Sequence, residues 1–212
     1  ETSTQVTCDG DGVSGRRIQA MYVRSSDVPD RYNSYLTSFK TWTRITDSVF
    51  NESAAETGGI RHVRFVHDAN CEPVILNVVL SPTGDDNFDN TVSELRNLGY
   101  ERSDRKYMLF MDANVYCGFG GGYFSDSPGV DNINNNTWGV GRVDTKCWAD
   151  MFYNHHVHEL IHAMGAVEKS APHISAGYHC VDEYDRMCYD DDGGGPVTMQ
   201  YLCPNSDHER LL

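Results

Sequence analysis

The sequence predicts an α/β fold in which helices cover a mixed sheet. Two observations lead to this prediction: apolar residues recur at helical spacing in some segments, and short runs rich in β-branched residues stand between those segments. A chain of 212 residues can bury a core unaided, and this one contains no fixed repeat and no Pro- or Ser-rich linker. We therefore expect one domain over residues 1–212.

Apolar residues at helical spacing, such as Tyr35, Phe39 and Trp42, indicate the helices. Glycine in a left-handed conformation commonly ends a helix, so a glycine that follows such a segment marks its end. The helices are expected over residues 30–53, 89–98 and 148–164, followed by Gly58, Gly99 and Gly165.

Short segments rich in β-branched and aromatic residues indicate the strands. They are expected over residues 60–66, 74–80, 106–112 and 138–144. The run at 106–112 is almost continuously apolar, which is typical of a strand buried on both faces, and 138–144 is expected to return as an edge strand. The Gly- and Asn-rich stretch 118–136 predicts a long surface excursion, and loops are expected beyond residue 165.

The charge balance excludes some partners. Seventeen basic and 31 acidic residues give a formal net charge of −14, which would repel a phosphate backbone. Nucleic acid and an anionic membrane are therefore not expected as partners. No apolar run approaches the roughly 18 residues that a membrane-spanning helix needs. We expect a soluble monomer.

The cysteines indicate an oxidising compartment. The seven cysteines are spread along the chain without a CxxC pair, which favours scattered disulfides over a zinc ribbon or a redox motif. We therefore expect a secreted, extracellular protein. Because seven is odd, at least one thiol is free, pairs between chains or lacks its partner, and the connectivity stays open.

The helix expected at 148–164 carries the motif His158-Glu159-Leu160-Ile161-His162. Residues four apart share one helix face, so His158 and His162 can both present a ring nitrogen to one ion. Glu159 stands beside that face and can reach a water on the metal without binding the metal itself. The motif predicts a zinc site for hydrolysis, with Glu159 as the general base.

Two further features accompany the motif. Gly165 stands three residues after His162, where it can end the helix and turn the chain back toward the metal. Met187 is followed two residues later by Tyr189. With these residues the sequence resembles the metzincin zinc peptidases, and its tail resembles that of bacterial secreted snapalysin-like members. The resemblance is specific over residues 158–189 and only architectural over residues 1–146.

The resemblance implies an upper lobe over 1–165, with a mixed twisted sheet and the active-site helix, and a loop-rich lower lobe over 166–212. It implies a Met-turn at Met187 and a catalytic Tyr189, which can bind zinc or stabilise the tetrahedral intermediate. The function that it implies is a zinc-dependent endopeptidase acting on protein or peptide substrates.

The third metal ligand departs from the family pattern. The position where metzincins usually place His, and snapalysins Asp, is Glu168 here. Residues 168–172 look like an insertion that delays the ligand, so His173 is favoured as the third ligand. Glu168, His179 and Asp182 are also possible at this position of the site.

Other functions stay open at this point. One is a catalytically silent, zinc-containing binding or toxin-like module, and another is a glycan-binding domain that uses calcium and the loop 118–136. The acidic runs at 85–89 and 190–192 could hold Ca²⁺, although neither matches an EF-hand and solvated turns are the commoner interpretation.

Overall fold

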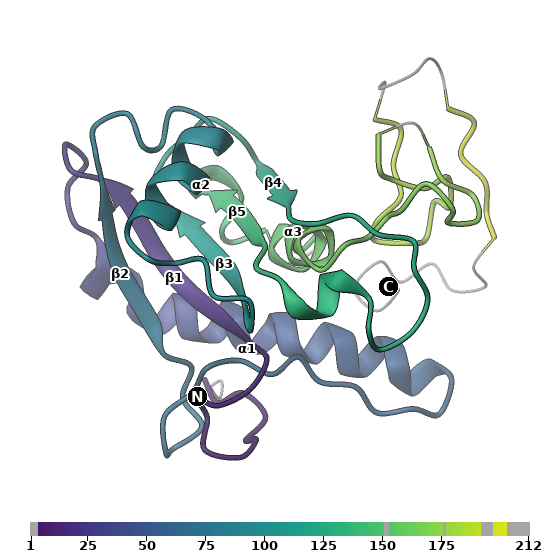
Figure 1. The fold of residues 1–212 in the computed structure, drawn as a ribbon, viewed down its shortest axis with the longest axis horizontal. Helices are drawn as coiled ribbons and strands as arrows, with labels where there is room; N and C mark the ends of the chain where they lie inside the picture. The colour runs from purple at the N-terminus through teal and green to yellow at the C-terminus, as the bar shows by residue number, and fades with distance from the viewer. Residues whose placement is uncertain (1–3, 151–152, 176, 192–196, 203–212) are drawn as a thin grey trace.

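The computed structural model describes residues 4–150, 153–175, 177–191 and 197–202. It forms a mixed five-stranded sheet with helices on both faces (Figure 1). The strands are β1 (Arg17–Ser25), β2 (Ile75–Leu80), β3 (Arg105–Met111), β4 (Gly118–Gly121) and β5 (Val140–Asp144). Their order is β2-β1-β3-β5-β4, and all pairs are parallel except β4 with β5. The expected mixed α/β class is confirmed.

Three α-helices enclose this sheet: α1 (Tyr32–Glu56), α2 (Phe88–Asn97) and α3 (His155–Ala163). Helices α1 and α3 share one core cluster with the sheet face that carries Tyr22 and Phe110. The opposite face, which carries Met21 and Leu109, packs against α2 through Leu95. β3 is buried along its whole length because both faces are covered, as its apolar run predicts.

Two expected helices lie close to their predicted positions, but the third is shorter. The expectation over 148–164 places its start too early, because Asn154 adopts a left-handed backbone (φ 45°) and caps a helix that begins at His155. Upstream, residues 145–147 form only a short 3₁₀ turn. At the other end Gly165 has a φ of 101°, so the predicted glycine end of the helix is confirmed.

The observed strands differ from the expected ones in three respects. β1, which stands between β2 and β3, has no counterpart among the sequence predictions. Residues 60–66 form a single bridge, from Phe65 to Ile18 of β1, because β2 takes over the same side of β1 two residues further on. The strand near 138–144 is present as β5 but is internal; the edge is β4, inside the segment for which the sequence predicts an irregular excursion.

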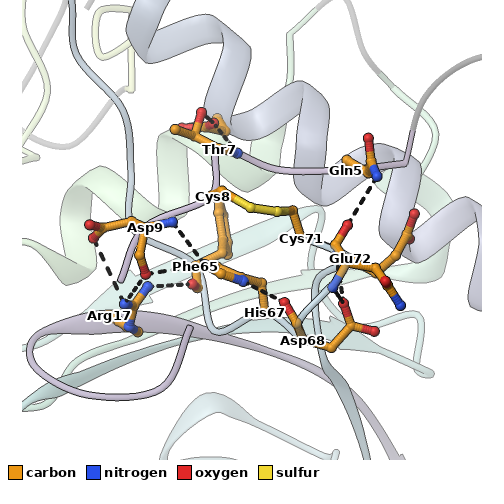
Figure 2. The surroundings of a disulfide bond; sticks show 12 residues. Gln5, Thr7, Cys8, Asp9, Arg17, Phe65, His67, Asp68, Cys71 and Glu72 are labelled. Atoms are coloured by element: carbon orange, nitrogen blue, oxygen red, sulfur yellow. Dashed lines mark hydrogen bonds and ion pairs between the residues drawn. A yellow bond between two sulfur atoms is a disulfide. The ribbon is translucent and has the colours of Figure 1, made fainter. Parts of the chain in front are cut away.

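Disulfides cross-link the loops around the sheet and helices. They join Cys8 to Cys71, Cys117 to Cys147, and Cys180 to Cys188. The seventh cysteine, Cys203, lies outside the described residues. Figure 2 shows the first bridge, which holds the N-terminal segment against the loop before β2. The predicted scattered disulfides are therefore confirmed, and they are typical of chains that fold in an oxidising compartment.

The described residues beyond 165 form only turns and isolated bridges, as expected for a loop-rich region. Figure 1 shows them, in green and yellow, on the side of α3 away from β2. Within the described part of the chain, no helix is both long and apolar enough to cross a membrane.

Candidate metal centre

Three histidines meet at one point beside α3. His158 and His162 come from the helix, and His179 comes from the loop beyond it. Each pair of their Nε2 atoms is 3.1 Å apart. Two nitrogens bound tetrahedrally to one ion at about 2.0–2.1 Å lie roughly 3.3 Å apart. The triangle of nitrogens therefore has the size that one metal ion requires.

The other ring nitrogen of each histidine fixes its tautomer. Nδ1 of His158 donates to the backbone oxygen of Arg186 at 2.9 Å, and that of His162 donates to Ala166 at 2.7 Å. Nδ1 of His179 donates to the carboxylate of Asp191 at 2.9 Å. Because all three partners are acceptors, each Nε2 keeps its lone pair and faces the common point. Histidines that bind metals are commonly oriented in this way, by a hydrogen bond from the other ring nitrogen to a carboxylate or a backbone carbonyl.

Burial keeps the two helix histidines neutral. Burial, with a smaller contribution from the neighbouring imidazoles, lowers the pKa of His158 to about 3 and that of His162 to about 4. Metal ligation requires neutral imidazole, so no proton has to leave these rings at neutral pH. A buried group of three imidazoles with converging lone pairs fits a divalent cation such as zinc.

The expected third ligand, His173, lies outside the group, and His179 takes its place. Ile174 forms an antiparallel bridge with Cys180, and Val181 N–H donates to the His173 oxygen, so residues 173–175 and 179–181 pair as a small hairpin. His173 is exposed at this hairpin, whereas His179 is buried and turned toward α3. His173 therefore does not join His158 and His162 in this structure, because the hairpin turns a later histidine, His179, inward.

Glu168 and Asp182 also lie away from the three histidines. Glu168 is outside the group, and burial raises the pKa of its carboxyl group. The Asp182 carboxylate accepts the backbone N–H groups of Tyr184 and Leu202, so it stabilises the local turn instead. Of the four residues that the sequence offers as third ligand, His179 is the one that joins His158 and His162.

Glu159 is buried between α3 and β4. A Cβ at Gly118 would lie 2.2 Å from Glu159 Oε1, so the Glu159 side chain would have to move to admit one. A Cβ at Gly120 would lie 2.5 Å from the Glu159 backbone oxygen. The glycines of β4 thus let the strand run directly over α3. Burial raises the pKa of the Glu159 carboxyl group to about 8. A carboxyl group with this environment is suited to exchanging a proton with a reacting molecule.

Tyr189 stands at the edge of the group. Its ring centroid lies 4.2 Å from that of His179 and 5.8 Å from that of His158. The side chain is 47% exposed, and burial of the remainder raises the pKa of its phenol, with Glu159 adding to the effect. Two residues earlier, Met187 is buried in the core cluster that contains Leu160 of α3. The structure therefore brings both sequence-predicted residues to this region.

A cleft passes on either side of the histidines. One part, of about 570 Å³, contains His162 and His179 and runs along β4. The other, of about 850 Å³, lies toward the start of α3. Four residues line both parts: Gly118, His158, Glu159 and Tyr189. The three histidines, called the metal group below, are therefore open to a groove that extends in two directions from them.

Other metal-like groups among the described residues consist largely of disulfides. Cys8 and Cys71 are bonded to each other, and the adjacent His67 uses both ring nitrogens, accepting from Asp9 N–H at 3.0 Å and donating to the Asp68 oxygen at 2.8 Å (Figure 2). The groups at Cys117 and Cys180 likewise contain a closed disulfide. The three-histidine group is therefore the best candidate for a metal site.

Comparison with known proteins adds no family to this description. No family model matches the chain, and no curated protein matches it. Eleven chains of solved structures match, among them one described as "Structure of a chaperone-substrate complex". It is 18% identical over 75% of this chain and 28% of that chain, with a TM-score of 0.29. The chain thus spans less than a third of that protein's length, and a TM-score this low carries no argument.

Sequence reasoning misses several residues of the site. The sequence indicates Asp191 only as part of an acidic run that could hold calcium, but its carboxylate accepts from His179 Nδ1. Gly118 and Gly120 fall in a segment predicted to be irregular, yet they bring β4 against Glu159. The glycine-rich run at 118–122, interrupted only by Phe119, is a signal that could have indicated a close approach of two backbones.

Proposed function

We propose that the chain is a secreted zinc endopeptidase of metzincin type, with zinc held by His158, His162 and His179. The observation that carries this proposal is the triangle of Nε2 atoms beside the buried carboxyl group of Glu159. Three imidazoles leave room for further coordination, which is typical of catalytic zinc rather than structural zinc. Residues 1–165 then form the upper lobe of a single catalytic domain, and the loop-rich residues form the lower lobe.

Zinc, when bound, would polarise a peptide carbonyl and lower the pKa of a water molecule toward neutral. The chain's own groups supply the remaining steps. The positive charge of bound zinc would lower the pKa of Glu159 and so favour its carboxylate form. That carboxylate accepts a proton from the attacking water and delivers it to the nitrogen of the departing amine. The Tyr189 hydroxyl, on the open side of the group, donates a hydrogen bond to the oxygen that gains negative charge.

β4 offers a place for the polypeptide substrate. It is the last strand of the sheet, and its far side is not paired with another strand of the described residues. An extended peptide can add to such an edge through its backbone, which gives affinity without fixing the sequence. The course of β4 over Glu159 supports this placement, and β4 replaces the edge expected at 138–144.

The test compares the wild-type protein with Glu159→Gln on unfolded casein. We expect zinc-dependent cleavage by the wild type, loss with a chelator and recovery with zinc. The Gln variant should bind the same amount of zinc and lose activity by roughly 10²–10⁴-fold, because it cannot accept the proton. Equal cleavage by the two proteins would contradict the proposal.

The catalytically silent module remains the second candidate. It predicts one tightly bound zinc in the wild type without cleavage of casein. The presence of Glu159 and Tyr189 beside the histidines favours the active enzyme over this second candidate.

A further inference from the structure

Aromatic side chains gather on one side of the metal group. Phe88 and Phe119 lie 4.5 Å apart between ring centroids, and Phe124 stacks on Tyr178 at 5.1 Å. The two pairs come from separate parts of the chain, with Phe88 at the start of α2 and Phe119 in β4. All four rings line the 570 Å³ cleft that contains His162 and His179.

These rings remain open to a ligand. Phe119 is 46% exposed, Phe124 is 43% exposed and Tyr178 is 36% exposed, although each packs against another ring. Apolar side chains that line a concave site beside polar functional groups are typical of ligand-binding clefts. The aromatic cleft therefore offers a large apolar side chain two walls on which to bury its surface.

The cleft on the other side of Glu159 has a different lining. Besides Glu159, which lines both parts, it contains four acidic residues, whereas the aromatic part contains one, Asp89; the four are Asp150, Glu183, Asp185 and Asp190. An apolar side chain bound beside these carboxylates would remove charged groups from water, which costs free energy. We therefore expect an apolar side chain of the substrate to bind on the aromatic side. The two directions along the groove are thus chemically distinct.

The direction in which β4 runs determines which end of a bound peptide lies on the aromatic side of the groove and which on the acidic side. β4 begins at Gly118, beside the Glu159 carboxylate, and continues past Gly120 to Gly121, where a Cβ would meet the Phe88 ring at 3.0 Å. Antiparallel pairing is slightly more stable than parallel pairing. A peptide paired antiparallel with β4 therefore places the residues N-terminal to the attacked bond beside the aromatic rings.

Resting on the proposed function, we infer that the enzyme selects substrates with a large apolar side chain on the N-terminal side of the bond that it cleaves. Phe119 and Phe124, one from each pair, determine this selectivity. Full burial of a Phe side chain is worth about 1.5–3 kcal/mol, which corresponds to roughly 10- to 150-fold in kcat/KM.

The experiment uses a peptide library with cut sites read by mass spectrometry, followed by two matched peptides carrying Phe or Ala at the selected position. We expect the wild type to prefer Phe by roughly tenfold or more. Phe119→Ala and Phe124→Ala should each reduce the Phe-to-Ala ratio of kcat/KM several-fold, because the Phe side chain of the peptide loses an aromatic wall against which to bury its surface. Tyr201→Ala is the matched control, since Tyr201 is 70% exposed and lines neither part of the groove.

An unchanged ratio in both Phe variants, no preference in the wild type, or a preference on the C-terminal side of the cut would overturn the inference. If the wild type cleaves no peptide, it is the proposed function that fails. The inference is then decided by the affinities of the two peptides for the zinc-loaded protein. Tighter binding of the Phe peptide by about tenfold supports it, and equal affinities overturn it.

Discussion

Each histidine of the metal group depends on a second residue for its orientation. Two of these residues offer backbone oxygens, at Arg186 and Ala166, so any side chain could serve there. The third, Asp191, uses its carboxylate, and only this contact depends on residue type. The first two contacts orient the histidines of α3, and the third orients His179, which belongs to a loop.

The third ligand provides a test at this scale. His179→Ala removes one of the three converging nitrogens, so we expect zinc affinity to fall by orders of magnitude, as measured by competition with a chromogenic chelator. His173→Ala is the matched control and should keep wild-type affinity, because His173 is exposed and outside the group. The opposite order of the two variants would assign the site to His173.

Residue-scale reasoning from sequence succeeds where spacing determines geometry. His158 and His162 are one helical turn apart, so their convergence follows from the helix alone. Which later histidine faces this pair depends on a loop of many residues, where the Ile174–Cys180 pairing and the Cys180–Cys188 disulfide accompany the inward turn of His179. Neither contact has a sequence period that predicts it.

Among the elements, the helices are predicted more successfully than the sheet. The long helix α1 shows a clear apolar stripe, whereas β4 consists of glycines and one Phe. Glycine has low strand propensity, so the local sequence indicates a loop. The packing requirement that makes Gly118 and Gly120 necessary becomes visible only when α3 lies against the strand.

A substitution in β4 tests this packing. In Gly120→Ala the new Cβ would meet both the Glu159 oxygen and His162 Cβ at 2.5 Å, so strand and helix must separate. We expect destabilisation of about 1–3 kcal/mol and loss of cleavage, measured by urea denaturation and peptide assay. Gly121→Ala is the control, because its Cβ meets only a side chain, the Phe88 ring. An equal loss in the free energy of unfolding for the two variants would contradict the close contact between β4 and α3.

β3 carries a buried cation whose effect depends on pH. Burial lowers the pKa of Lys106 from 10.5 to about 8. Below pH 8 the lysine is charged in both states, and the folded state bears the cost of desolvation. Between about pH 8 and 10.5 the unfolded chain holds the proton more strongly, so wild-type stability rises with pH across this window.

Lys106→Met removes this cost. We expect it to stabilise the fold at pH 7 by up to about 3 kcal/mol, and the gain should shrink as the pH approaches 10.5. Urea denaturation of both proteins at pH 7 and pH 10 measures the difference. A gain that does not change with pH would show that desolvation of the charge is not its cause.

At the scale of the whole molecule, the three-histidine group is accompanied by a strongly acidic composition and, among the described residues, by three disulfides. Two of the bridges adjoin the site: Cys117 precedes β4, and Cys180 follows His179. The first ties the start of β4 to Cys147, in the turn after β5, and the second joins two parts of the loop region that carries His179 and Met187. The sequence predicts this cross-linking in kind, but not the pairing, because the connectivity depends on the folded arrangement.

The most direct test of the metallopeptidase account is a zinc titration of the metal-free protein while cleavage of a quenched fluorescent peptide is followed. The account predicts no cleavage without metal, a linear rise as zinc is added, and saturation at one equivalent per chain. Cleavage that is independent of zinc, or one equivalent of bound zinc without any cleavage, would contradict it.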